Sequence, residues 1–180
     1  MINGINSREM ILEILLEIEE GEHSHVAIRN ALSKYQFLPK QDRAFITRVC
    51  EGTLEYRIQI DYIINSFSKV TVDKMKPAIR EILRSAVYQL KYMDSVPDSA
   101  VCNEAVKLAQ RKGFYNLKPF VNGVLRTIAR EMDQVRFPQK EDDLLKYLSV
   151  KYSMPEVLVT RWLEAYGEET TEKILADFLT

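Results

Sequence analysis

The sequence has few of the residues that sheet-forming, disulfide-linked or metal-linked proteins depend on. Six glycines and six prolines in 180 residues do not favour strands joined by tight turns. The two cysteines, Cys50 and Cys102, lie far apart and fit no C-x-x-C spacing, so neither a disulfide framework nor a zinc site is predicted. Each has apolar neighbours at helical spacing, which indicates a buried free thiol and fits a reducing cytosol.

Long apolar runs are also absent. Glu13 and Glu17 interrupt the stretch MILEILLEI, and no segment reaches the length that a membrane-spanning helix needs. The N-terminus has no basic segment ahead of an apolar core, so no signal peptide is predicted. We therefore expect a cytoplasmic protein that makes no membrane contact.

The sequence contains no motif typical of a phosphate-binding loop, a metal site or a catalytic acid–base pair. Neither G-x-G-x-x-G nor G-x-x-x-x-G-K-[ST] occurs, so no phosphate-cradling loop is predicted. His23 and His25 lie in a predicted loop with no further ligands at metal spacing, which favours an exposed pair over a metal site. The glutamates from Glu17 to Glu22 fit a charged helix end better than an acid–base pair. We predict no catalytic residue, no cofactor-binding residue and no metal ligand in this chain.

Charge is present but unevenly distributed. The formal net charge is only −1, which argues against a strongly basic nucleic-acid binder. Residues 41–140, however, hold 17 Lys/Arg against 11 Asp/Glu, whereas residues 1–40 hold 4 against 6 and residues 141–180 hold 4 against 9. This middle region suggests a surface that could meet phosphate groups, and a merely solvated helical surface is the alternative.

Apolar residues recur at helical spacing along the whole chain, and no sustained alternation indicates a strand. Helices are predicted over 7–20 and 24–35, after Pro39, from Pro77, from Pro97 to Gly113 and from Pro119, with 68–74 as a connection. Gly52 falls inside the pattern that follows Pro39, where the helix either continues or bends. Three short helices follow at 141–152, 155–166 and 168–179. The prediction is an all-α chain: a main bundle of about seven helices over 1–137, then a three-helix segment over 138–180.

Six stretches, in this order, resemble one family: NSREMILEIL, DRAFITRVCEGTLEYRIQIDYIIN, IREILRSAVYQLKYMDSVP, VPDSAVCNEAVKLAQRKG, FVNGVLRTIAR and MPEVLVTRWLEAYGEE. Together they resemble the NusB-like domain that begins the Sun (RsmB) family of bacterial ribosomal RNA cytosine-5 methyltransferases. The last stretch is similar to the segment that joins this domain to the catalytic part. The resemblance covers essentially all 180 residues.

The resemblance implies a function as well as a fold. A NusB-like helical bundle binds RNA and a ribosomal protein in the antitermination factor NusB. In the methyltransferases it implies a domain that positions 16S ribosomal RNA for a following S-adenosylmethionine-dependent domain with two catalytic cysteines. Cys50 and Cys102 do not match those motifs. The expected chain is therefore a non-catalytic fragment of such an enzyme, with ribosomal RNA and its own methyltransferase domain as partners. A free-standing antitermination factor of the NusB type and a helical interaction domain with an incidental basic surface are the alternatives.

Cations at helical phasing are the candidates for phosphate contact. The predicted RNA-binding residues are Arg43, Arg48, Arg80, Arg84, Arg111, Lys112, Lys118, Arg126 and Arg130. Phe114 and Tyr115 either stack on bases or fold onto the bundle. The N-terminal segment MINGINSREM carries only Arg8, whereas NusB is Arg-rich there, so contact through that edge is not expected.

Two further features of the sequence, the Asn122–Gly123 pair and Trp162, each allow two interpretations. Asn122 and Gly123 are poor helix formers inside FVNGVLRTIAR. Either Asn122 bonds backbone while Gly123 permits close helix packing, or the pair belongs to an RNA surface with Arg126 and Arg130. Trp162 and its apolar neighbours need a partner surface, which is either the bundle or the expected catalytic domain.

Overall fold

The computed structural model describes residues 6–179, and over that range the chain consists of α-helices, short 3₁₀ helices and connections, without a strand. The α-helices are α1 (Ser7–Glu19), α2 (Ser24–Lys34), α3 (Lys40–Glu55), α4 (Arg57–Phe67), α5 (Pro77–Tyr92), α6 (Asp98–Arg111), α7 (Lys118–Glu131), α8 (Leu144–Tyr152) and α9 (Glu156–Phe178). The 3₁₀ helices are η2 (Val72–Lys74), η3 (Tyr115–Leu117) and η4 (Met132–Gln134). The all-α prediction is confirmed.

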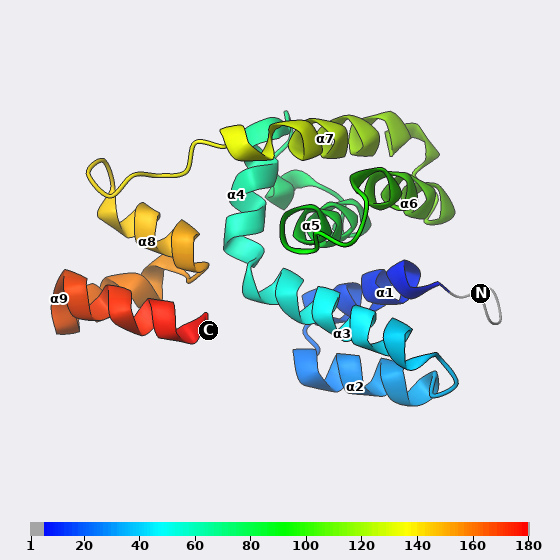
Figure 1. Cartoon of the computed structure of the whole chain (residues 1–180), viewed down its shortest axis with the longest axis horizontal. Helices are drawn as coiled ribbons and strands as arrows, with labels where there is room; N and C mark the ends of the chain where they lie inside the picture. Colours follow the sequence, from blue (N-terminus) through cyan, green and yellow to red (C-terminus); the bar gives the residue numbers. More distant parts are fainter. Residues whose placement is uncertain (1–5, 180) are drawn as a thin grey trace.

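Helix α5 forms the centre of the main bundle, with α1, α3, α4, α6 and α7 packed around it (Figure 1). Every residue from Glu81 to Gln89 is buried, so this helix is covered on all sides rather than on one face. Ile82, Leu83 and Val87 are at most 1% exposed. Removing a side chain of this size from water stabilises the fold by about 1.5–3 kcal/mol.

Helices α1 and α5 begin at residues that favour a helix start, as the sequence predicted. Asn6 stands just before α1, and its Oδ1 accepts a hydrogen bond from the backbone N–H of Glu9 at 2.8 Å. This bond satisfies one of the N–H groups that a helix start leaves free. Pro77 occupies the first turn of α5, where its missing N–H costs no hydrogen bond.

Gly52 lies inside α3, and the helix continues through it to Glu55. A Cβ atom built at Gly52 would lie 2.1 Å from Cζ of Tyr88, which belongs to α5. The ring of Tyr88 is buried and lies 5.4 Å from the ring of Tyr92, so its place is fixed. Only glycine therefore allows α3 to pack this closely against α5.

The last two helices have an apolar cluster of their own. Leu148, Val159 and Leu175 form its buried part, separate from the large cluster of the main bundle. Helix α9 turns at Gly167, where φ is 79° and ψ is 174°, so that Glu156–Phe178 is two helical pieces rather than one straight helix. Together with α8 these pieces form the three-helix segment that the sequence predicted. Asp143 caps α8, which begins three residues later than expected.

The tail, defined as residues 144–178, is joined to the main bundle by hydrogen bonds that cap α4. Tyr56, which precedes α4, supplies no side-chain cap. The hydroxyl of Ser153 instead accepts from the backbone N–H of Ile58 at 3.1 Å and of Gln59 at 3.4 Å. The Gln59 side chain in turn donates to the carbonyl oxygen of Lys151 at 3.3 Å. The tail thus satisfies the free N–H groups at the start of a bundle helix.

Trp162 lies within the tail. It is half-buried against the Leu148 cluster, and its ring stacks on Phe178 at 5.7 Å. Despite this contact, 62% of the surface of Phe178 is exposed to solvent.

Candidate nucleic-acid interface

Helices α6 and α7 lie side by side at one end of the bundle and run in opposite directions (Figure 1). Their apolar sides face the core, because residues such as Leu108 and Leu125 recur at helical spacing and are buried. The opposite sides are left to polar residues. On α7 these follow one another every fourth position, at Lys118, Asn122 and Arg126 and then Arg130.

Two hydrogen bonds join these outer sides across the helix pair. Lys118 donates to Oε1 of Gln110 at 2.8 Å, and Arg126 donates to Oδ1 of Asn103 at 2.7 Å. Arg126 also donates through Nε to Oδ1 of Asn122 at 3.1 Å. We call this surface the α6–α7 face; it consists of Asn103, Gln110, Lys118, Asn122, Arg126 and Arg130.

The partners of these cations decide the charge of the face. Lys118 and Arg126 are bonded to amide oxygens, which carry no net charge. The side chain of Arg130 is 68% exposed, and its one carboxylate neighbour, Glu131, is 3.9 Å away. Lys118 and Arg126 are therefore held in place without an ion pair, and Arg130 is exposed with only a long one. The amide groups beside them can donate and accept hydrogen bonds, which suits a nucleic acid with its phosphates and base edges.

The connection between α6 and α7 carries two aromatic residues, one half-buried and one exposed. Phe114 is half-buried and packs against the main cluster, which confirms the interpretation that it folds onto the bundle. Tyr115 is 64% exposed, and the ammonium group of Lys118 lies 4.7 Å from its ring centroid. An exposed ring beside a cation fits a stacking role next to the α6–α7 face.

Arg84 lies inside the fold instead of on a surface. It is 8% exposed, and its guanidinium group pairs with both carboxylate oxygens of Asp61 on α4, at 2.7 and 2.9 Å. It also contacts both carboxylate oxygens of Glu81 at 3.2 Å. These bonds join α4 to α5, and the buried position leaves Arg84 no free surface for phosphate. The geometry therefore corrects its assignment as an RNA contact.

Arg80 is similarly engaged. It donates to the carbonyl oxygen of Met75 at 3.0 Å and forms an ion pair with Glu19 on α1. The predicted pairing of Arg80 and Arg84 on one exposed helix face is thus wrong, because α5 is surrounded by other helices and has no such face.

Carboxylates of α1 offset two cations at the end of α6. Arg111 lies 3.6 Å from Glu9, and Lys112 pairs with both Glu9 and Glu13. Arg111 and Lys112 are close to the α6–α7 face along the chain, but their ion pairs bridge α6 to α1. Exposed ion pairs of this kind contribute little to stability.

Arg43 and Arg48 bind carbonyl oxygens at helix ends. Arg43 donates to the carbonyl oxygens of Leu32 at 2.7 Å and of Tyr35 at 3.2 Å, at the end of α2. Arg48 donates to the carbonyl oxygen of Tyr92, the last residue of α5, at 2.9 Å. A cation at a helix C-terminus is favourable because the free carbonyl groups carry partial negative charge. These two arginines lie away from the α6–α7 face.

The structural interpretation of Asn122 and Gly123 is wrong. The Asn122 side chain is exposed and accepts from Arg126 rather than bonding to backbone. A Cβ atom built at Gly123 would meet no atom within 4 Å, so no helix approaches it. The close-approach glycine of this fold is Gly52. Gly123 lies exposed between Asn122 and Arg126, on the outer side of α7.

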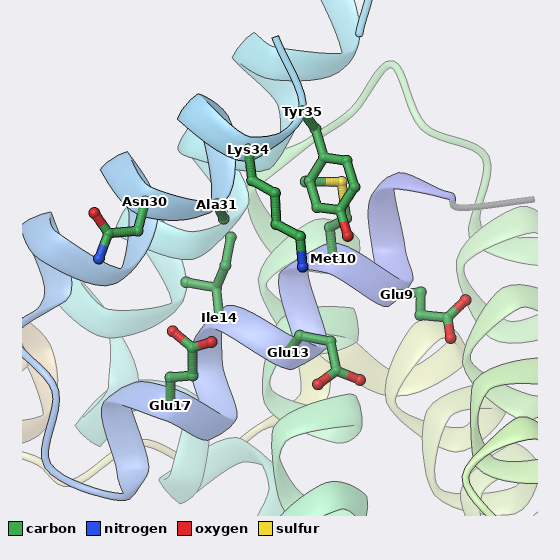
Figure 2. Close-up of a pocket in the computed structure, with 9 residues that line it drawn as sticks. All are labelled: Glu9, Met10, Glu13, Ile14, Glu17, Asn30, Ala31, Lys34 and Tyr35. Atoms are coloured by element: carbon green, nitrogen blue, oxygen red, sulfur yellow. The ribbon is translucent and has the colours of Figure 1, made fainter. Parts of the chain in front are cut away.

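A groove of about 440 Å³ runs between α1 and α2. Glu9, Glu13 and Glu17 follow one another along its α1 side, and Lys34 extends towards α1 from α2 (Figure 2). Met10 and Ile14 are among its apolar lining residues. Three carboxylates in a row disfavour a polyanion, so we do not include this groove in the interface.

Residues 6–179 present no metal site and no accessible thiol. No group of three or more His, Cys, Asp or Glu residues within that range could hold a metal ion. Cys50 and Cys102 are buried and unbonded, as predicted, and burial raises the pKa of both thiols. No described helix is both long and apolar enough to cross a membrane. The sequence MINGINSREM falls partly outside the described residues, and Arg8 within it bonds to Gln89 at 3.1 Å.

Sequence reasoning missed Asn103 and Gln110, the amides opposite α7. A signal for them existed, because they are seven residues apart on α6 and share the side opposite its apolar residues. Uncharged amides carry no charge signal in the sequence, whereas the structure pairs Lys118 and Arg126 of α7 with them.

These observations define a class: an all-helical domain with a cationic, amide-rich face on two antiparallel helices. The family model described as "NusB family" matches residues 5–130. The chain therefore belongs to the NusB family, as its sequence motifs predicted.

Two kinds of curated relative match the chain. It is 35% identical, over 93% of its length, to the probable ribosomal RNA small subunit methyltransferase B of Bacillus subtilis (strain 168), of which it covers 37%. It is 33% identical, over 72% of its length, to the transcription antitermination protein NusB of Dictyoglomus thermophilum, of which it covers 85%. The chain thus spans little more than a third of the first relative, and its likeness to that protein extends past the NusB match.

Solved structures share the fold. The crystal structure of PH0851 matches 96% of the chain with a TM-score of 0.73 and 21% identity, and the chain covers 38% of that protein. The crystal structure of antitermination factors NusB and NusE in complex with double-stranded RNA matches 69% of the chain with a TM-score of 0.63 and 21% identity. The match to PH0851 includes the tail as well as the main bundle.

Proposed function

We propose that this chain is the RNA-binding, NusB-like portion of a small-subunit ribosomal RNA cytosine-5 methyltransferase. The observation that carries the proposal is the α6–α7 face, where Lys118 and Arg126 are bonded to neutral amides and Arg130 is exposed, with only a long ion pair of 3.9 Å to Glu131. The likeness to a ribosomal RNA methyltransferase over nearly the whole chain, tail included, supports this assignment. A solved NusB relative bound to RNA supports the choice of ligand.

In this proposal the face holds RNA through its phosphates. Lysine and arginine side chains contact phosphate oxygens, while Asn103, Gln110 and Asn122 supply donors and acceptors for 2′-hydroxyl groups or base edges. Tyr115 offers a ring for an unpaired base. Residues 1–137 are then the binding bundle, and residues 138–180 form the linker towards a catalytic domain. The chain holds ribosomal RNA in the cytoplasm while that domain reacts.

S-adenosylmethionine belongs, in this proposal, to the catalytic domain rather than to these residues. The thiols of Cys50 and Cys102 are both buried in the main apolar cluster, and burial raises their pKa values. A cysteine nucleophile requires an accessible thiolate. We expect the purified 180-residue chain to transfer no methyl group to ribosomal RNA, and methyl transfer by it would contradict the assignment.

A transcription antitermination factor of the NusB type, which binds RNA and a ribosomal protein, is the second candidate. It is favoured by the coverage of such relatives, 85% of the Dictyoglomus thermophilum protein. The α1–α2 groove has Glu9, Glu13 and Glu17 on one side and would suit a basic protein segment that competes with Arg111 and Lys112 for Glu9 and Glu13. A stable complex with a ribosomal protein, lost on Glu13→Gln/Glu17→Gln substitution, would favour this candidate.

The RNA proposal is tested by salt-dependent binding. The variant Lys118→Gln/Arg126→Gln/Arg130→Gln keeps polar side chains and removes three charges. Each phosphate contact to single-stranded RNA contributes about 0.7 to the slope of log affinity against log salt, so the slope should decrease by about 2.

The matched control is Arg29→Gln/Lys40→Gln/Lys173→Gln, which removes three exposed charges away from the face. It should leave the slope nearly unchanged. Equal slopes for the two variants would refute the α6–α7 face as the binding surface, and absence of binding by the wild type at low salt would refute the RNA-binding function.

A further inference from the structure

A second cationic hollow lies between the main bundle and the tail. It has a volume of about 200 Å³. Its lining includes Lys91 at the end of α5, Phe137 and Gln139 of the connection after α7, and Tyr147 and Lys151 of α8. In Figure 1 the connection from α7 to α8 passes the end of α4 before it reaches the tail. We call this hollow the bundle–tail cleft.

The lining of the cleft contains two basic side chains, Lys91 and Lys151, of which Lys151 is paired with Glu172 behind the lining and Lys91 has no carboxylate neighbour in the lining. Among the described residues that line it, two are lysines and none is a carboxylate. The α1–α2 groove has three glutamates and one lysine in its lining, and a hollow beside α9 has three glutamates and two lysines, so both have more acidic than basic side chains. The bundle–tail cleft therefore differs from both in attracting an anion.

Aromatic rings hold the two ammonium groups at the cleft. Lys91 lies 5.4 Å from the ring centroid of Tyr92 and 5.7 Å from that of Phe137. Lys151 lies 5.2 Å from the centroid of Tyr147 and contacts Glu172 at 3.7 Å. Cation–π contacts at such sites are weak, at about 0.5–1 kcal/mol, so a phosphate group can draw the lysines away from the rings.

The walls of the cleft are fixed by contacts across the junction. Phe137 stacks on Tyr62 of α4 at 5.7 Å, and the Tyr62 hydroxyl donates to the carbonyl oxygen of Arg136 at 2.6 Å. Gln59 binds the end of α8 and accepts from Tyr92. The rings are thus held in position. The Lys151 ammonium group donates to the Tyr147 hydroxyl at 2.9 Å, so it lies at the cleft wall, and within the described residues Lys91 is held by cation–π contacts alone.

We propose that the bundle–tail cleft binds single-stranded RNA, with Lys91 and Lys151 on a backbone phosphate and an unpaired base against Phe137 or Tyr147. The inference rests on the proposed function and adds a second contact site to it. Positive charge combined with aromatic rings is the arrangement that single-stranded nucleic acids require. Most of the lining lies beyond residue 130, where the family match ends, so the tail supplies a binding site and not only a connection.

The test compares RNA binding by the full chain and by the variant Lys91→Gln/Lys151→Gln. Loss of the contact to one phosphate of single-stranded RNA should lower the salt slope by about 0.7. The matched control, Lys146→Gln/Lys173→Gln, removes two exposed lysines of the tail that lie outside the cleft lining. It should bind as the wild type does, and thermal unfolding should show that both variants are folded.

Competition distinguishes RNA from other sources of phosphate. Inorganic phosphate and adenosine monophosphate should displace the oligonucleotide only at concentrations well above its own, whereas displacement at equal concentration would overturn the proposal. Equal losses by the variant on a single strand and on its duplex would refute the unpaired-base contact.

The two proposals fail separately. If the cleft variant binds like its control while the α6–α7 variant loses affinity, the cleft inference is wrong and the proposed function stands. If the wild type binds no RNA, the proposed function itself is wrong.

Discussion

At the scale of single residues, two helical glycines show opposite relations to their surroundings. Gly52 faces the Tyr88 ring, whereas Gly123 faces no atom within 4 Å. The sequence left two interpretations open at Gly123, close packing or an RNA surface, and at Gly52 a continuing or a bent helix, because both glycines lie in amphipathic helices and look alike in one dimension. Which glycine another helix approaches depends on the positions of neighbouring helices, and local spacing does not contain that information.

The substitution Gly123→Ala should stabilise the fold by about 0.5–1 kcal/mol. Alanine is the better helix former, and the added methyl group meets no neighbour. Urea denaturation measures the change, and RNA titration of the same variant shows whether the open surface matters for binding. Gly52→Ala is the matched comparison: it should destabilise by about 1–3 kcal/mol, because Tyr88 must leave its place. Changes of the same sign at both positions would contradict this account.

At the scale of elements, the α4–α5 contact contains a buried charged group. Glu81 is 3% exposed, and burial raises the pKa of its carboxyl group, with Arg84 acting in the opposite direction. A carboxyl group with a raised pKa is easier to protonate in the folded state than in the unfolded chain. Its ionisation therefore costs stability as the pH rises through the folded-state pKa.

The substitution Glu81→Gln should make stability less dependent on pH. Near pH 4 the wild-type group is largely protonated and resembles glutamine, so the two proteins should unfold at similar denaturant concentrations. Near neutral pH the variant should be the more stable, because it avoids a buried carboxylate. Urea unfolding at both pH values measures the difference. If the variant matched the wild type at pH 4 but were less stable than it at pH 7, the attraction between Glu81 and Arg84 would outweigh the cost of burying the carboxylate.

At the scale of the whole molecule, few hydrogen bonds join the tail to the bundle, and Ser153 supplies two of them. Its hydroxyl caps α4 from a residue more than ninety positions away along the chain. The tail cluster is small, with Leu148, Val159 and Leu175 as its buried residues, so much of its order depends on this junction.

The substitution Ser153→Ala should loosen the tail without unfolding the bundle. It removes the acceptor of two backbone N–H groups, at a cost of about 1 kcal/mol. Amide hydrogen exchange should increase in α8, α9 and the first turn of α4, and remain unchanged in α1 and α5. Ser66→Ala, which removes an exposed hydroxyl within α4, is the control. Uniform acceleration across the chain would indicate that tail and bundle unfold as one unit.

The sequence by itself determined the helices of this protein, the family and the buried thiols. Apolar spacing, prolines at helix starts and a capping asparagine act within a few residues, so a linear pattern contains them. Only the tertiary structure decided which cations remain available. Arg84 and Arg126 both look like surface arginines at helical spacing, yet one is enclosed between two carboxylates and the other lies among amides. The free charge of a side chain depends on partners contributed by distant helices, and these become neighbours only when the bundle packs.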